Sequence, residues 1–385
     1  MKLRIGVVGG GLVAQAMHLH YLAHLSSLFE LVAVADPSAT VRDALQRRYN
    51  LEATYEDHLG LFEGTKLDAA VICSPAQTHI QVTLNALEHG LHVFVEKPMC
   101  ITLADADRVI EAQRRTGKVV QVGYMKRFDR AWERMREGLP ESAESLRYIS
   151  VVVHDPEFGP FFGPDDIVRG ADVPAAVLAS GREQMRAQVR EAVGADSPAV
   201  ITAFEGAFLG SLVHDVNVVH GLLERMGEPL PAQVIDGDWW NEGQAVTGAV
   251  RLSNGARWDS AWIQLLDVYE YRESVSFFFA EEVHTLAFPS PWLKQSPTRY
   301  EVSRARDSAR VAESFESYEE SFARELAHFH DCVVNGTECR TPPDQARLDM
   351  DVLTKMFLKA GSGDLERLTK CRDPRRGSEG GAVHL

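Results

Sequence analysis

Three features are scarce or missing in this sequence, and each absence excludes a class of protein. We find no run approaching the roughly 18–20 apolar residues that a membrane helix requires, so no membrane span is expected. The chain has only five cysteines in 385 residues. They are scattered without a close metal-type pair, which favours reduced thiols in a cytoplasmic protein and no metal site. The apolar run after Met1 is too short for a secretory leader.

Positive charge is also in short supply. The chain has 40 Lys and Arg against 55 Asp and Glu, a formal net charge of −15. Such an acidic surface repels phosphate backbones and anionic lipid, so we expect neither nucleic acid nor a membrane as partner. The length exceeds the usual size of one hydrophobic core, which predicts two domains.

Short apolar runs alternate with helical periodicity over residues 1–125. We expect strands at 3–8, 31–35, 67–73, 92–95 and 119–122, and helices at 12–26, 38–49, 77–88 and 103–116. The strands are continuous apolar runs, as burial on both faces requires. This alternation predicts an α/β fold, with an N-terminal Rossmann-type, doubly wound parallel sheet.

After about residue 125 the strands become alternating. The segments 246–252 and 256–264 flank an Asn-Gly turn and predict a hairpin. Further strands are expected at 274–279 and 282–288, and helices at 198–226, 319–335 and 344–360. We therefore expect a C-terminal α+β domain over 126–371, built on a largely antiparallel open sheet, and a disordered tail at 372–385. We expect residues 155–200 to form a helical insertion. Its role is open between a lid, a wall of the substrate site, an oligomer contact and a pair of surface helices.

A glycine-rich turn joins the first strand to the first helix. Its pattern, Gly9-x-Gly11-x-x-Ala14, allows a tight turn and close approach of a pyrophosphate. The following helix offers N–H groups and a positive dipole end, beginning near Leu12 and Val13. Because the turn lies between a strand and a helix near the chain start, it predicts dinucleotide binding.

Asp36 ends the second expected strand, 25 residues after Gly11. A carboxylate there can accept hydrogen bonds from a ribose diol and repels a 2′-phosphate. This favours NAD over NADP. Ser38 and Arg42 lie nearby and could contact a 2′-phosphate, so NADP is not excluded.

Glu96-Lys97-Pro98 follows the expected strand 92–95. In an open α/β sheet the carboxyl ends of the strands face the ligand crevice, which places Lys97 toward the nicotinamide. Burial beside other cations lowers an amine pKa and suits it to proton transfer. The alternative is an ordinary surface lysine at a strand end.

A stripe of small and polar residues runs along the expected helix 198–226. Its members are Ala207, Gly210, His214, Asn217 and Gly221, with apolar neighbours. The stripe indicates either a face turned to a ligand or a buried histidine with its hydrogen bonds satisfied.

Over residues 3–130 the sequence resembles the Gfo/Idh/MocA family, the relatives of glucose–fructose oxidoreductase and inositol dehydrogenase. Glu-Lys-Pro in this context is the specific signal. The matching segments are Gly9–Ala14, Ala33–Asp36, Ser74-Pro75 followed by His79, Glu96–Pro98 and Gly123–Phe128.

The resemblance implies hydride transfer between NAD(P) and a secondary alcohol or ketone of a sugar, nucleotide sugar or cyclitol. It implies cofactor contacts from the glycine turn and from Ser74, Pro75, His79 and Glu96, with Lys97 among both the cofactor contacts and the catalytic group. It also implies a second-domain sheet that forms a homodimer or homotetramer.

The second catalytic motif departs from the family. Family members often carry Asp-x-x-x-His-x-x-Asp, whereas this chain has Gly210, His214 and Asn217. His214 therefore carries over as catalytic, but the first Asp does not. Tyr124, Arg127 and Asn217 are candidates for the substrate side. Two further hypotheses stay open: an enzyme with tightly bound NAD and no net redox change, and a cofactor-binding sensor without catalysis.

Overall fold

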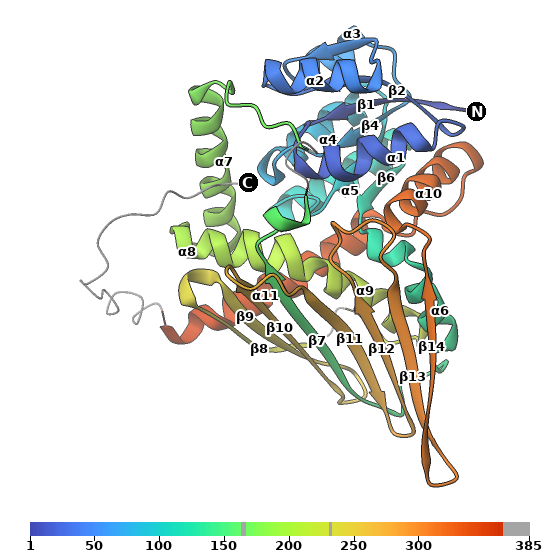
Figure 1. The fold of residues 1–385 in the computed structure, drawn as a ribbon. Coiled ribbons are helices and arrows are strands. Elements are labelled where there is room, and N and C mark those ends of the chain that lie inside the picture. Colours follow the sequence, from blue (N-terminus) through green and yellow to red (C-terminus); the bar gives the residue numbers. More distant parts are fainter. Residues whose placement is uncertain (163–166, 231–232, 365–385) are drawn as a thin grey trace.

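Two sheets, joined and separated by helices, make up the computed structural model, which describes residues 1–162, 167–230 and 233–364 (Figure 1). The expected tail at 372–385 lies outside the described residues. The expected fold class is confirmed: a parallel sheet comes first, and a mostly antiparallel sheet follows it.

The first sheet is parallel, with the strand order β3-β2-β1-β4-β5-β6. Its strands are β1 (Leu3–Val8), β2 (Phe29–Ala35), β3 (Ala53–Tyr55), β4 (Ala69–Ile72), β5 (His92–Glu96) and β6 (Val120–Gly123). Its helices are η1 (Ala14–His18), α1 (Leu19–His24), α2 (Ala39–Tyr49), α3 (His58–Gly64), η2 (Ala76–Thr78), α4 (His79–Glu88) and α5 (Leu103–Thr116). The order reverses between β1 and β4, and ligands bind beyond the carboxyl ends of strands at such a point.

The second sheet has the order β14-β13-β12-β11-β7-β10-β9-β8. Its strands are β7 (Leu146–Pro156), β8 (Gln233–Trp240), β9 (Ala245–Arg251), β10 (Arg257–Leu265), β11 (Arg272–Phe279), β12 (Glu282–Phe288), β13 (Thr298–Arg306) and β14 (Ala309–Ser317). Neighbours are antiparallel except β7 and β10. The expected hairpin is confirmed as β9 and β10, and in its turn Gly255 takes the positive φ of 86°.

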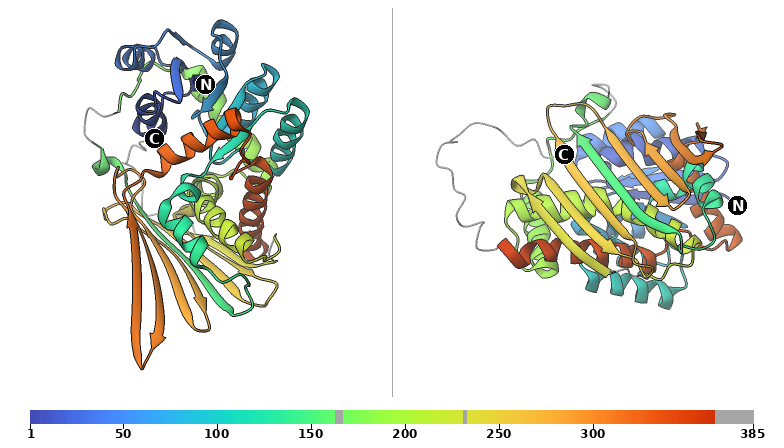
Figure 2. Two further views of the ribbon diagram at one scale, coloured as in Figure 1. Left: turned by 90° about the vertical axis from the view of Figure 1, so that its right-hand side faces the viewer. Right: turned by 90° about the horizontal axis from the view of Figure 1, so that it is seen from below.

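Helices lie between the two sheets and leave one face of the second sheet uncovered (Figure 2). The helices after β6 are η3 (Met125–Phe128), α6 (Arg130–Gly138), η4 (Gly159–Phe161), α7 (Ala175–Val193), α8 (Pro198–Ile201), η5 (Thr202–Leu212), α9 (Val213–Arg225), η6 (Asn241–Gly243), α10 (Ser321–Asn335) and α11 (Pro343–Asp364). Of these, η5 and α11 contact the second sheet from the side of the first domain, whereas α7 and α10 pack against elements of the first domain. Although α10 comes late in the chain, its Phe322, Leu326 and Phe329 pack into the core of the first domain.

The expected helix at 198–226 is present, but its middle part η5 is a π-helix of 11 residues. The expectation that no segment is long and apolar enough to span a membrane was wrong. Pro198–Arg225 passes that test by length and composition, and 56 % of its most apolar window is buried inside the molecule. It packs between α11 and the second sheet, as a core helix does.

Candidate active site

The glycine turn after β1 has the shape that a pyrophosphate requires. Gly9 has φ +93°, and a Cβ there would lie 2.6 Å from the Ser74 amide nitrogen. Any larger residue would therefore strain the turn. Gly11 is exposed, and a Cβ built on it would meet no atom within 4 Å. Leu12 and Val13 are partly exposed, so the turn and the start of the helix face open space.

Asp36 is held beside this turn by two backbone amides. Its Oδ2 accepts from Gly10 N at 2.8 Å and its Oδ1 from Ser38 N at 2.9 Å. A carboxylate offers about four acceptor positions, so two remain for a ribose diol. The expected cofactor groups Gly9, Gly11 and Asp36 are thus brought together, and they fit a dinucleotide.

His79 joins the loops that follow β4 and β5. Its buried ring lies between two carbonyl oxygens, with Nδ1 2.7 Å from Pro98 O and Nε2 2.6 Å from Ser74 O. Burial lowers its pKa, against the opposing effect of these carbonyls. The side chain is committed to the backbone, so His79 would act on a cofactor by fixing Ser74 and Pro75 in place.

Lys97 follows β5 and reaches across to the long helix. Its Nζ donates to Gly210 O at 2.5 Å. Glu96 is buried, with Oε1 2.6 Å from His18 Nε2, and its Oε2 accepts from Lys97 N. Burial lowers the pKa of the Lys97 ammonium, an effect that Glu96 opposes and Lys126 strengthens. A neutral amine is therefore more accessible here than on a surface lysine.

His214 and Tyr124 lie together, and His214 is close enough to Lys97 for the two to interact electrostatically. Their rings meet edge to face at 6.2 Å. Among the described residues, neither His214 Nδ1 nor the Tyr124 hydroxyl has a hydrogen-bond partner, although both atoms are buried. Burial, Lys97 and Lys126 hold the pKa of His214 well below its usual value, so its ring is neutral near pH 7. Buried polar atoms without partners cost free energy, so both groups have unused hydrogen-bonding capacity that a ligand could take up.

Asp155, which the sequence analysis missed, completes this group from the end of β7. Its Oδ2 accepts from Trp262 Nε1 at 3.3 Å and from Ser211 Oγ at 3.4 Å, while its Oδ1 is buried and has no partner among the residues that the structure describes. Burial raises its pKa to about 6. Because Ser211 follows Gly210, Asp155 lies beside the residue that binds Lys97.

A buried cluster of charged side chains lies near Asp155 and interacts with it electrostatically. Lys126 Nζ pairs with Glu273 and lies 3.9 Å from Asp215 Oδ1, and the Tyr271 hydroxyl also donates to Glu273. Burial disfavours the Lys126 ammonium, but the two carboxylates outweigh it and raise its pKa. Burial and Glu273 raise the pKa of Asp215 well above its usual range. Asp215 thus belongs to this cluster, a role for which the sequence carried no signal.

Arg127 and Asn217 have other partners than the expected substrate. The buried Arg127 guanidinium stacks on Trp132 at 4.9 Å and donates to Asn217 O. Asn217 Nδ2 donates to Asp349 Oδ2 at 2.7 Å, on α11. Burial lowers the pKa of Arg127 to about 10. Both residues therefore fix α9 against its neighbours, although Asn217 Oδ1 is still without a partner in the described part of the chain.

Two of the scattered cysteines meet in space. Cys332 Sγ lies 3.3 Å from His328 Nε2 and also contacts the Cys339 thiol, and both thiols are free. These contacts lower the pKa of Cys332 to about 5. In the described residues, no three His, Cys, Asp or Glu side chains are arranged to hold a metal ion.

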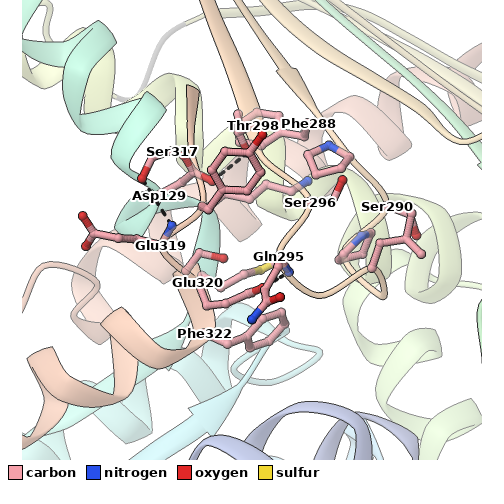
Figure 3. Close-up of a pocket in the computed structure, with 17 residues that line it drawn as sticks. Asp129, Phe288, Ser290, Gln295, Ser296, Thr298, Ser317, Glu319, Glu320 and Phe322 are labelled. Carbon is pink, nitrogen blue, oxygen red and sulfur yellow. Dashed lines mark hydrogen bonds between the residues drawn. The ribbon is translucent and has the colours of Figure 1, made fainter. Parts of the chain in front are cut away.

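The pocket in Figure 3 borders the buried charge cluster, because Lys126 lines it, whereas Lys97, His214 and Asp155 are not among its lining residues. Loops after β12 and β14 line it, with Phe288, Ser290 and Glu320 among its walls. Thr298 Oγ1 donates to Asp129 Oδ2 across it at 2.6 Å. Lys126 in its wall pairs with Glu273, so the pocket lies on the far side of the charge cluster and holds none of the residues proposed for catalysis.

The first domain is similar to known oxidoreductases. Residues 3–124 match the model of the oxidoreductase family with an NAD-binding Rossmann fold. This match to the Gfo/Idh/MocA model is confined to the N-terminal domain. Inositol 2-dehydrogenase of Salmonella typhimurium is 36 % identical over 138 residues, 35 % of this chain and 41 % of that enzyme. D-glucoside 3-dehydrogenase of Escherichia coli is 34 % identical over 148 residues, 38 % of this chain and 42 % of that one.

The chain therefore spans less than half the length of these curated relatives in the matched region. Beyond it the likeness is one of fold. The structure of scyllo-inositol dehydrogenase from Lactobacillus casei, with bound NAD(H) and scyllo-inositol, superposes with a TM-score of 0.66. At 17 % identity it covers 94 % of this chain and 97 % of that chain, so the two-domain architecture is shared throughout.

Proposed function

We propose that this protein is an NAD-dependent dehydrogenase that interconverts a secondary alcohol and a ketone on a cyclitol or sugar. The observation that carries the proposal is the position of Lys97. Its amine follows β5 at the carboxyl edge of the parallel sheet and interacts electrostatically with His214 and Asp155. In the described part of the chain, His214 Nδ1 and Asp155 Oδ1 are buried without a hydrogen-bond partner. The named substrates of the relatives favour a polyhydroxylated ring.

The first domain would hold NAD through groups already in place. The turn Gly9–Ala14 would bind the pyrophosphate, Asp36 the adenosine ribose, and the loops at Ser74, Pro75 and Glu96 the nicotinamide side. When bound, the nicotinamide takes up or supplies the hydride. Everything else that the reaction needs must come from the protein side chains.

Oxidation of a secondary alcohol releases one proton along with the hydride, and this chain must accept it. Neutral Lys97 can hydrogen-bond the reacting hydroxyl and take its proton at Nζ. His214, held neutral, can accept a hydrogen bond at Nδ1. Asp155, whose pKa is raised to about 6 by burial, is ionised at neutral pH and stabilises the Lys97 ammonium that forms. Asp155 would thus provide the carboxylate that Gly210, which stands in the place of the family's first Asp, lacks.

A panel assay tests the proposal. Purified protein is mixed with NAD and, one at a time, myo-inositol, scyllo-inositol, glucose and methyl glucosides, and NADH absorbance is followed. We expect turnover with at least one polyol. NAD that co-purifies, does not exchange and supports only net non-redox products would favour the second enzyme class. Saturable NADH binding without turnover on any compound would favour a sensor.

The uncovered face of the second sheet supports the expected homo-oligomer (Figure 2). An exposed sheet of this size presents a broad surface for a second copy of the chain. We propose a dimer or tetramer through this face, which sedimentation of the purified protein tests directly.

A further inference from the structure

The segment Ile167–Asp172, from the insertion after β7, crosses the adenosine end of the cofactor site. Two hydrogen bonds fix it to the helix that follows the glycine turn. Gln15 Nε2 donates to Val168 O at 2.8 Å, and Val168 N donates to Gln15 Oε1 at 2.9 Å. Gln15 Nε2 also donates to Gly10 O, so one buried amide connects the turn and the crossing segment.

At its end the segment places a carboxylate on the N-terminus of α2. Asp172 Oδ1 accepts from Ser38 Oγ at 2.5 Å, and its Oδ2 accepts from Thr40 N at 3.0 Å. Ser38 is the N-cap of this helix, since its Oγ also accepts from Val41 N. A negative charge is favoured there by the free N–H groups and the helix dipole. The hydrogen bonds from Ser38 and Thr40 lower the pKa of Asp172 to about 2, so it is ionised at any working pH.

The crossing segment approaches the N-terminus of α2 most closely at Gly170, where a side chain would displace Ser38. A Cβ built on Gly170 would lie 1.9 Å from Ser38 Oγ. The segment is also packed rather than loose, because Ile167 and Val168 lie against the core of the first domain. The contact between Asp172 and Ser38 is therefore part of the fold.

Arg42, the other side chain that could bind a 2′-phosphate, also has partners within the protein. Arg42 NH1 donates to Asp36 O at 2.7 Å, and its NH2 lies 3.6 Å from Glu56 Oε1. Of the two side chains that the sequence offers for a 2′-phosphate, Ser38 binds Asp172 and Arg42 binds backbone and Glu56.

We propose that Asp172 occupies the place of the 2′-phosphate of NADP and thereby restricts the adenosine site to NAD. The inference rests on the proposed function and adds to it a selectivity residue outside the dinucleotide-binding domain. A 2′-phosphate would meet two carboxylates, Asp36 and Asp172, and would find its hydrogen-bond donors already taken. At the pyrophosphate end, no described residue lies within 4 Å of a Cβ built on Gly11.

Paired titrations with NADH and NADPH test this. In the wild type we expect NADH to bind at least about tenfold more tightly. Asp172→Asn keeps the shape and removes the charge, and Asp172→Ala removes both. Each should tighten NADPH binding by about tenfold or more, while NADH binding changes by less than about threefold. Asp43→Asn, an exposed carboxylate on the same helix, is the matched charge control and should leave the ratio unchanged.

The outcomes separate the two proposals. Wild-type protein that binds neither coenzyme contradicts the proposed function itself. Wild-type protein that binds NADPH as tightly as NADH overturns the role of Asp172 without any variant. The role of Asp172 is also overturned if the ratio of NADPH to NADH affinity stays at the wild-type value in both variants. An equal loss of affinity for both coenzymes overturns it as well.

Discussion

The two ends of the proposed cofactor site differ in how their polar groups are satisfied. At the adenosine end, Asp36, Ser38 and Gln15 each have more than one hydrogen bond, and Asp172 adds two more. At the reacting end, His214 Nδ1, Tyr124 Oη and Asp155 Oδ1 are buried and have no hydrogen-bond partner within residues 1–162, 167–230 and 233–364.

The difference has a physical meaning. Satisfied networks stabilise one arrangement and select a ligand by shape and charge. Unsatisfied buried atoms lower stability, and a fold keeps them where a ligand or a proton will use them. Mutations at the first end should therefore change affinity and selectivity, and mutations at the second should change turnover.

The largest expected effect is on stability, at the cluster behind the reacting end. Lys126→Met leaves Glu273 and Asp215 buried without their cation, which should lower the free energy of unfolding by about 3–5 kcal/mol. Urea unfolding measures it. The double variant Lys126→Met/Glu273→Gln should recover part of the loss, because one orphaned charge is gone. A single variant as stable as the wild type would mean that the cluster does not stabilise the fold.

Next comes Lys97→Met. This change removes the amine but keeps much of the side-chain volume, so turnover should fall by roughly 10² or more. NADH affinity should stay within about threefold of the wild type, because the adenosine end is untouched. Unchanged turnover would take Lys97 out of the mechanism.

The variant Asp155→Asn tests the reacting end through the pH dependence of alcohol oxidation. With a pKa of about 6, the carboxylate ionises as pH rises from 5 to 7, so wild-type alcohol oxidation should increase over that range. The amide cannot ionise. We expect about tenfold lower turnover at pH 7 and no increase tied to this group. If the variant kept the wild-type pH profile, another residue would be responsible.

The smallest effect is expected at Gln15. Gln15→Ala removes the paired bonds to Val168 and should lower stability by about 1–2 kcal/mol. Turnover with saturating substrate and NAD should change by less than about threefold. A loss as large as that of Lys97→Met would contradict the division between the two ends.

The sequence predicted the first domain well because its signals are local. Continuous apolar strands, the glycine turn and the positions of Asp36 and Lys97 need only short-range patterns. The strand β3 was missed because three residues are too few to show a period. In the helix 198–226, the π-segment changes the phase that a 3.6-residue period assumes, so the stripe did not identify one ligand-facing surface: Asn217 binds Asp349 instead.

Asp155 and Asp172 could not be found in this way. Each is brought to the site by long-range contacts, Asp155 to Ser211 and Trp262 and Asp172 to Ser38. The sequence analysis began the insertion at 155, whereas β7 runs to Pro156. The strand alternation from Ile149 to Val153 was the available signal for that end. For Asp172, no local pattern pairs it with a helix cap 134 residues away.

The most direct test of the account is NADH binding to the turn after β1. We predict saturable fluorescence enhancement with one NADH per chain in the wild type, and its loss in Gly9→Val. That substitution is incompatible with φ +93° and would press against the backbone of Cys73 and Ser74. Circular dichroism must show that the variant is folded, and Gly11→Ala serves as the milder second variant. No saturable binding in the wild type, or equal binding in folded Gly9→Val, would contradict the account.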